Sequence, residues 1–160
     1  MGDRLLDDQL GTTALPSIEA ITELPEGVEA LNTLAEAEGF RFLRRLIDDW
    51  RCGDNRFDQE GEAFFAVWLD GQLVGLGGLN RDCDDDTLGR IRRVYVHPAA
   101  RSHGLGQALI ERLEHHAAQT FLRVVLYTTA IPAMQFYEGL GYRRILGHPQ
   151  RSHEKRLQSA

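Results

Sequence analysis

Two apolar segments separated by Asp70 and Gly71 constrain the fold more than any other feature of this sequence. Residues 62–69 read E-A-F-F-A-V-W-L and residues 72–79 read Q-L-V-G-L-G-G-L. Both are apolar, and the first is rich in residues that favour strands. An Asp-Gly pair between two such segments is typical of a two-residue β-hairpin. The sequence therefore predicts an antiparallel strand pair over residues 62–79.

The rest of the chain alternates between helical and strand-like segments, with apolar residues spaced accordingly. The expected helices are 25–39, 42–50, one that begins near residue 105, and 132–140; the expected strands are 17–24, 88–96, 122–128, 142–146 and an edge strand at 153–157. This order predicts an α/β fold in a single domain, with a mixed, mostly antiparallel sheet of about six to seven strands flanked by about four helices. Residues 1–15 are polar and aperiodic, so we expect a flexible N-terminal arm before a domain spanning 16–160.

Composition narrows the class of protein. The 160 residues carry a net charge of -6, which argues against nucleic acid as a partner. No apolar segment approaches the length of a membrane span or a signal peptide, so no membrane partner is expected. The two cysteines, Cys52 and Cys83, lack C-x-x-C spacing and indicate a cytoplasmic protein. The six histidines show no metal-ligand spacing, and His148 and His153 are expected to be solvent-exposed.

The segment R-S-H-G-L-G-Q-A-L, residues 101–109, joins an expected strand to an expected helix. The first amides of a helix have no intrahelical acceptor and lie at the positive end of its dipole, so such a turn can bind phosphate. Gly104 and Gly106 allow a ligand to approach the backbone closely. The two glycines are equally consistent with a tight strand-to-helix connection.

Comparison with known phosphate-binding motifs decides between a phosphate site and a simple strand-to-helix connection. No G-K-[S/T] follows the turn, so a P-loop is excluded. A dinucleotide fingerprint is excluded as well, because Leu109 stands where the third glycine is required. The pattern R-x-x-G-x-G-x-A that begins at Arg101 resembles the acetyl-CoA signature of the GNAT superfamily of N-acetyltransferases. V-Y-V-H-P at 94–98 and A-x-x-F-Y-E-x-L-G-Y at 133–142 are similar to that family's fourth strand and late helix.

The resemblance implies a binding site for acetyl-CoA as cosubstrate. The main chain of Val94, Tyr95 and Val96 is expected to pair with the pantetheine arm, beside a bulge that separates this strand from the next. The turn is expected to hold the pyrophosphate through its backbone amides, with the side chains of Arg101 and His103 as further contacts. The residues of this turn are Arg101, Ser102, His103, Gly104, Leu105, Gly106 and Gln107.

The implied reaction is acetyl transfer to an amine by direct attack in a ternary complex. A main-chain amide near Val94 or Tyr95 is the expected oxyanion donor. Tyr137 stands at the family's usual position for the acid that protonates the leaving sulfur. An acid suits this role if its pKa lies near or above that of a thiol, and tyrosine at about 10 against about 8.5 does so. Tyr137 also belongs to an apolar helical stripe, where a tyrosine is often only packed; the motif position favours the acid.

Two departures from the family pattern bear on function. Ala130 stands where the family often has an asparagine that contacts the cofactor arm. Arginines 90, 92 and 93 occupy the strand where some members carry an acidic general base, so the base stays unassigned. The acidic residues 84–86 are interpreted as a solvated loop. These departures favour an alternative, a non-catalytic acyl-CoA-binding or interaction module on the same fold, whereas Tyr137 and the intact turn oppose it.

The family builds its acceptor site from segments that correspond here to residues 40–60 and 145–154. The first segment is acidic, and an acidic rim would attract a cationic amine; a solvated helix face explains the same charges. Its acidic residues are Asp48, Asp49, Asp54, Asp58 and Glu60. The acceptor is left open between a small-molecule amine and an amine of a peptide or protein, and a homodimer stays open as well.

Overall fold

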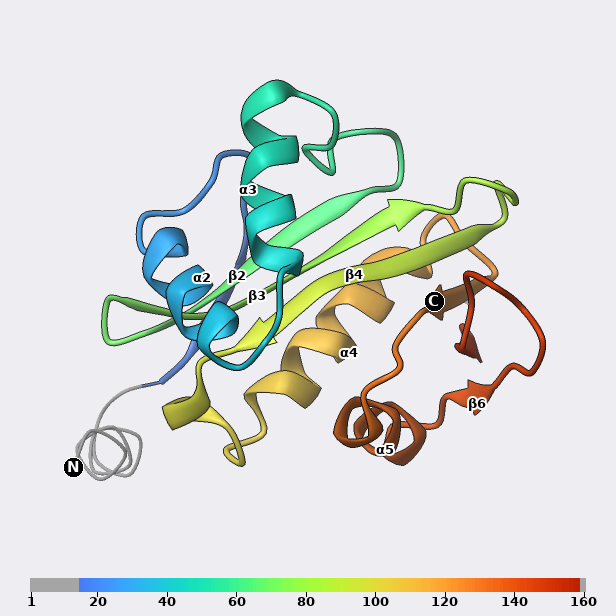
Figure 1. The fold of residues 1–160 in the computed structure, drawn as a ribbon. Helices are drawn as coiled ribbons and strands as arrows, with labels where there is room; N and C mark the ends of the chain where they lie inside the picture. The colour runs from blue at the N-terminus through green and yellow to red at the C-terminus, as the bar shows by residue number, and fades with distance from the viewer. Residues whose placement is uncertain (1–14, 159–160) are drawn as a thin grey trace.

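The computed structural model describes residues 15–158, which form a seven-stranded sheet with helices on both faces (Figure 1). The strands are β1 Ser17–Ala20, β2 Ala63–Leu69, β3 Gln72–Arg81, β4 Leu88–Val96, β5 Arg123–Leu126, β6 Arg143–Arg144 and β7 His153–Arg156. The helices are α2 Val28–Ala37, α3 Phe42–Cys52, α4 Leu105–Ala117 and α5 Ile131–Gly139, with a 3-10 turn, η1, at Pro98–Ala100. The predicted mixed sheet with about four helices is confirmed. The expected arm, residues 1–15, lies outside the described residues except for Leu15.

Strand order places the functional elements at the middle of the sheet. Neighbouring strands follow the order β1-β2-β3-β4-β5-β7-β6, and among the described strands only β4 and β5 run parallel. The predicted hairpin is confirmed: Leu69 pairs with Gln72, and the turn residues Asp70 and Gly71 have φ of 52° and 79°. Two consecutive left-handed residues match the twist of the flanking strands. The hairpin supports β4, which pairs along β3.

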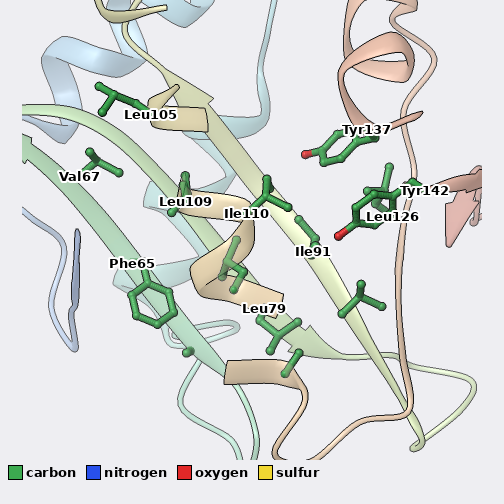
Figure 2. Close-up of a cluster of buried hydrophobic side chains, with 14 of the residues drawn as sticks. Phe65, Val67, Leu79, Ile91, Leu105, Leu109, Ile110, Leu126, Tyr137 and Tyr142 are labelled. Carbon is green, nitrogen blue, oxygen red and sulfur yellow. The ribbon is translucent and has the colours of Figure 1, made fainter. Parts of the chain in front are cut away.

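Two apolar clusters fix the helices on opposite faces of the sheet. On one face, α4 directs Leu105, Leu109 and Ile110 toward sheet residues that include Phe65 and Leu79 (Figure 2). The other face is covered by α2 and α3 (Figure 1). Apolar residues of α3 recur every three or four positions and form a single buried stripe, which consists of Leu43, Leu46, Ile47 and Trp50. Each fully buried leucine contributes about 2 kcal/mol to folding.

Several expected elements are shorter than predicted. The first strand ends at Ala20 rather than at residue 24, and the strand expected at 142–146 is only Arg143–Arg144. The first helix begins at Val28 rather than at Pro25, because Gly27 adopts φ of 97° and stands outside the helix. Within residues 15–158, no helix has the length and apolar character that a membrane span requires.

The C-terminal strand differs from prediction in its position. It was expected at an edge, but β7 lies between β5 and the two-residue β6. The expectation that His153 is solvent-exposed is also wrong, because this residue is fully buried. Its Nε2 lies 2.7 Å from Oε2 of Glu138 on α5, and its Nδ1 lies 2.9 Å from Oγ of Ser152. His153 therefore links α5 to the sheet.

A buried ionic network joins the β3–β4 turn to the C-terminal loop. The Asp82 carboxylate is buried, accepts hydrogen bonds from the Asp84 and Asp85 amides, and pairs with Arg90 and Arg151 at 2.9 and 2.5 Å. Burial alone would raise the pKa of Asp82, but hydrogen bonds from Arg151, the Asp84 amide and Arg90 hold the pKa below its usual value.

We predict that Asp82→Asn lowers the free energy of unfolding by about 3 kcal/mol at pH 7, because two guanidiniums lose their buried partner. A depressed carboxylate pKa stabilises the fold above about pH 4 and ceases to do so as the pH falls through the folded pKa. The difference between wild type and variant should therefore shrink below pH 4. Urea unfolding at pH 7 and pH 3.5 measures both effects. Asp84→Asn, which removes an exposed carboxylate from the same turn, is the control, and an equal loss in that variant would contradict the prediction.

Candidate active site

The separation of β4 from β5 creates the central feature of this site. The two strands pair only from Leu88 to Arg90, although β4 continues to Val96. Beyond Arg90 no described strand pairs with this edge of β4, and the two strands diverge (Figure 1). Their divergence coincides with a bulge: between Arg92 and Tyr95, three steps of β4 face two steps of β3. Arg93 lies in this bulge with φ of 61°. The bulge that the family resemblance implied is thus present.

A groove of about 1400 Å³ follows the unpaired edge of β4. One wall is β4 itself, and the other is formed by the end of β5, the residues after it and α5. The glycine turn closes one end, and side chains of α3 and of the loop before β7 also border the groove. The following predicted site residues line the groove: Val94, Tyr95, Val96, Arg101, Ser102, Gly104, Gly106, Gln107 and Tyr137. The structure thus brings most of the predicted site residues to one surface.

The glycine turn presents the amides that the sequence predicted. Gly104 is the N-cap of α4 with φ of 78°, and no side chain caps the helix. The Ala108 amide donates to the Gly104 carbonyl at 3.0 Å, so the three preceding helical amides have no acceptor one turn earlier. Ser102 also adopts a left-handed φ, of 71°, which its residue type did not indicate. The Leu105 side chain packs in the core, so only its main chain faces a ligand.

Arg101 is held by side chains rather than directed freely at a ligand. Its guanidinium donates to both carboxylate oxygens of Glu38 at 2.6 and 2.7 Å, and its Nε donates to the Val96 carbonyl at 3.0 Å. The Tyr95 hydroxyl donates to the same carboxylate at 2.5 Å. The Arg101 hydrogen bond is the main reason that the pKa of Glu38 is lowered. Glu38 could not be recognised from the sequence, because it lies 63 residues from Arg101 and belongs to no motif.

Tyr137 lies on α5 in the wall opposite β4. Its ring packs between Phe136 and Tyr142, with centroids 5.1 and 5.3 Å away, and its hydroxyl points toward β4 (Figure 2). The side chain is thus packed in the apolar stripe and also lines the groove. Within residues 15–158 the hydroxyl has no hydrogen-bond partner, whereas that of Tyr142 donates to Glu114 at 2.7 Å. Burial raises the pKa of Tyr137, so this hydroxyl is protonated at neutral pH.

Comparison with known proteins decides the family. Residues 60–144, more than half of the chain, match the family model for the acetyltransferase (GNAT) domain. The chain belongs to the GNAT acetyltransferase family. The resemblance found in the glycine turn and in the Tyr137 motif is thereby confirmed, since both motifs lie inside the matched residues of this GNAT domain.

Three relatives show how far the likeness extends. The amino-acid acetyltransferase of Mycobacterium tuberculosis is 37% identical over 139 residues, which cover 81% of this chain and 77% of that protein. The N-acetylaspartate synthetase of Danio rerio is 36% identical over 88 residues, or 53% of this chain and 31% of that protein. A crystal structure from Exiguobacterium sp. 255-15, assigned to the acetyltransferases, has a TM-score of 0.79 and 32% identity, and covers 89% of this chain and 93% of that one. The GNAT domain thus spans less than a third of the synthetase.

The segments expected to form the acceptor site contribute different residues to the GNAT groove than the sequence predicted. From segment 40–60 it is lined by Phe40, Phe42 and Arg45, whereas Asp49 and Asp54 border a separate hollow of about 370 Å³. The predicted acidic rim is therefore wrong for the main groove, because α3 presents an arginine there rather than its acids. From segment 145–154 the groove is lined by Pro149 and Gln150.

No acidic side chain on β4 is available as a general base in this GNAT domain. Arg90, Arg92 and Arg93 all line the groove. Asp84 and Asp86 are exposed on the β3–β4 turn, as the solvated-loop interpretation predicted. Cys83 also borders the groove, with its Sγ 3.9 Å from Oε1 of Gln150, a position that sequence analysis did not foresee.

We predict that Gly104→Leu weakens coenzyme A binding at least tenfold, because a side chain at this N-cap stands over the amides of the α4 start. Gly71→Leu is a matched control: both glycines have φ near 80°, and a Cβ at either meets nothing within 4 Å. Each variant should lose about 1 kcal/mol of folding free energy from left-handed strain. Isothermal titration calorimetry with coenzyme A should show the affinity loss only for Gly104→Leu; equal losses would contradict an anion site at this turn.

Proposed function

We propose that this GNAT domain transfers an acetyl group from acetyl-CoA to an amine by direct attack within a ternary complex. The observation that carries the proposal is the slot between β4 and β5. It has an unpaired strand edge along one wall, a helix start rich in free amides at one end, and the Tyr137 hydroxyl on the facing wall. These are the three features that a long thioester with a diphosphate requires.

The residues present fit coenzyme A along the whole slot. Amides of the pantetheine arm would pair with the main chain of Val94, Tyr95 and Val96 as an added strand does. The diphosphate would lie on the amides of residues 101–107, at the positive end of α4. Gly106 leaves room for this approach, since a Cβ there would come within 3.3 Å of Phe136. When bound, acetyl-CoA supplies the reactive thioester.

The chain's own groups then assist one displacement at the acetyl carbonyl. The acceptor nitrogen forms the C–N bond, and the C–S bond breaks as the thiol leaves. The amide of Val94 or Tyr95, next to the bulge, stabilises negative charge on the carbonyl oxygen by about 3 kcal/mol. Tyr137 donates its proton toward the departing sulfur and takes up the proton that the attacking nitrogen loses. The thiol thus receives the proton of Tyr137, and the proton from the amine restores the Tyr137 hydroxyl.

This route needs no acidic base on β4, provided that the amine binds in its neutral form. The names of the relatives include acetyltransferases of amino acids and of aspartate, so a small amine is the first acceptor class to test. A cytoplasmic location belongs to the same proposal, because Cys52 and Cys83 are both free and exposed.

We predict that Tyr137→Phe lowers kcat about a hundredfold and leaves the KM for acetyl-CoA within threefold of wild type, because the variant loses the proton donor and keeps the ring. The measurement is release of free thiol from acetyl-CoA across a panel of amines. Tyr142→Phe, which loses the structural hydrogen bond to Glu114, should keep kcat within threefold. Tight coenzyme A binding without thiol release on any amine would favour the non-catalytic module instead.

We predict intersecting double-reciprocal plots and full retention of kcat in Cys83→Ser, because direct transfer forms no acetyl-enzyme. Cys83 is the relevant thiol to replace, since it borders the groove, and Cys52→Ser on α3 serves as its control. Parallel plots, together with an isolable acetyl-cysteine that is absent from Cys83→Ser, would establish a covalent route.

A further inference from the structure

Three arginines gather at the end of the groove opposite the glycine turn. Arg92 and Arg93 are consecutive on β4, and Arg45 lies on the facing side of α3. The bulge places Arg92 and Arg93 near the same acidic residue of α3, Asp49, which lies 3.9 Å from Nη2 of Arg93. Among the described residues, Asp49 is the one carboxylate in an ion pair with these arginines, whereas Asp54 and Glu62 border the neighbouring hollow that Arg92 also lines.

The side chain of Arg93 is only 10% exposed, yet it donates no hydrogen bond within the described part of the chain. Burial first, and then the charge of Arg92, lower its pKa to about 10. Arg92 is half-buried and likewise has neither a hydrogen bond nor an ion pair within residues 15–158. Removing guanidinium donors from water without hydrogen-bond acceptors is costly, and two neighbouring positive charges add to that cost.

Three other arginines along the groove have partners, which sets Arg92 and Arg93 apart from them. Arg90 pairs with Asp82, Arg101 pairs with Glu38, and Arg81 donates to the Glu60 carbonyl at 2.9 Å. The arginines without hydrogen-bond acceptors therefore gather where the bulge of β4 faces α3. Residues held in sparsely populated backbone regions cluster at ligand sites, and Arg93 is such a residue.

The position of Arg92 and Arg93 indicates which of the two substrates supplies their hydrogen-bond acceptors. The diphosphate of the donor belongs at the glycine turn, at the far end of β4 from Arg92. The thioester then lies beside Val94, and the groove beyond it, toward Arg92 and Arg93, is left for the acceptor. This step rests on the proposed function.

We propose that the acceptor is a small amine that carries two carboxylates, such as an acidic α-amino acid, and that Arg92 and Arg93 bind these carboxylates with Arg45 at the rim. Guanidinium and carboxylate form paired, charge-assisted hydrogen bonds, which satisfy the donors that the chain leaves unpaired.

This assignment also accounts for the missing base. A free ammonium group is stabilised by the carboxylates of its own molecule. Once those carboxylates pair with guanidiniums, their stabilising effect falls and the neutral amine is favoured. The arginines that occupy the expected position of an acidic base therefore promote the reactive form of the acceptor in another way.

The test compares acceptors that match in size and differ in charge. Thiol release from acetyl-CoA is measured with L-glutamate and L-aspartate, with L-glutamine and L-asparagine, and with cadaverine as a dication. We expect kcat/KM at least tenfold higher for each dicarboxylate than for its amide. In Arg92→Met and Arg93→Met, KM for the dicarboxylate should rise at least tenfold, with unchanged coenzyme A affinity and unchanged or higher thermal stability.

Arg44→Met is the matched control, since Arg44 lies on α3 beside Arg45 but pairs with the surface residue Glu29 at 3.3 Å. It should leave all these values unchanged. A preference for cadaverine, or the same acceptor KM in both arginine variants and wild type, would overturn the inference and leave acetyl transfer standing.

Calorimetric titration of L-glutamate and L-aspartate into the protein saturated with coenzyme A separates the two proposals. Binding that is lost in Arg93→Met, without thiol release on any amine, would support the acceptor site and reject the acetyl transfer. Absence of both binding and turnover for the dicarboxylates would reject the acceptor site.

Discussion

The parting of β4 from β5 is the constraint on which the rest of this structure depends. One additional residue in β4, between Arg92 and Tyr95, leaves the second half of the strand without a partner on one side. A bulge bends its strand and ends regular pairing, and here it opens a groove through the middle of the sheet. The apolar contacts of Ile91 and Val96 with the α4 cluster hold β4 in place on either side of the bulge.

Much of the fold was predictable because its signals are local. Asp70 and Gly71 specify the hairpin by their own backbone preferences, and Gly104 does the same for the start of α4. The position of Tyr137 followed from a short motif. The order of helices and strands, read from periodicity alone, already defined the class of sheet. These features need no knowledge of what the rest of the chain does.

The features that escaped prediction depend on contacts between distant segments. His153 lies in a polar segment, H-E-K-R, and only the insertion of β7 between two strands makes it a buried partner of Glu138. Glu38 becomes part of the site through Arg101, far along the chain. The arginines of β4 were identified in the sequence, but they were interpreted only as evidence that this strand lacks an acidic general base. Their meaning depends on the bulge and on α3, neither of which any local pattern places.

The strand β4 serves two purposes with different atoms. Its backbone forms the unpaired edge along the groove, where we propose that the donor binds, whereas the side chains of Arg92 and Arg93 line the part proposed for the acceptor. Backbone atoms are common to every amino acid, so substitution along the strand leaves that edge intact while it alters the side chains beside the bulge. During evolution, a fold arranged in this way can therefore change its acceptor substrate while it retains its main-chain contacts with the acyl donor.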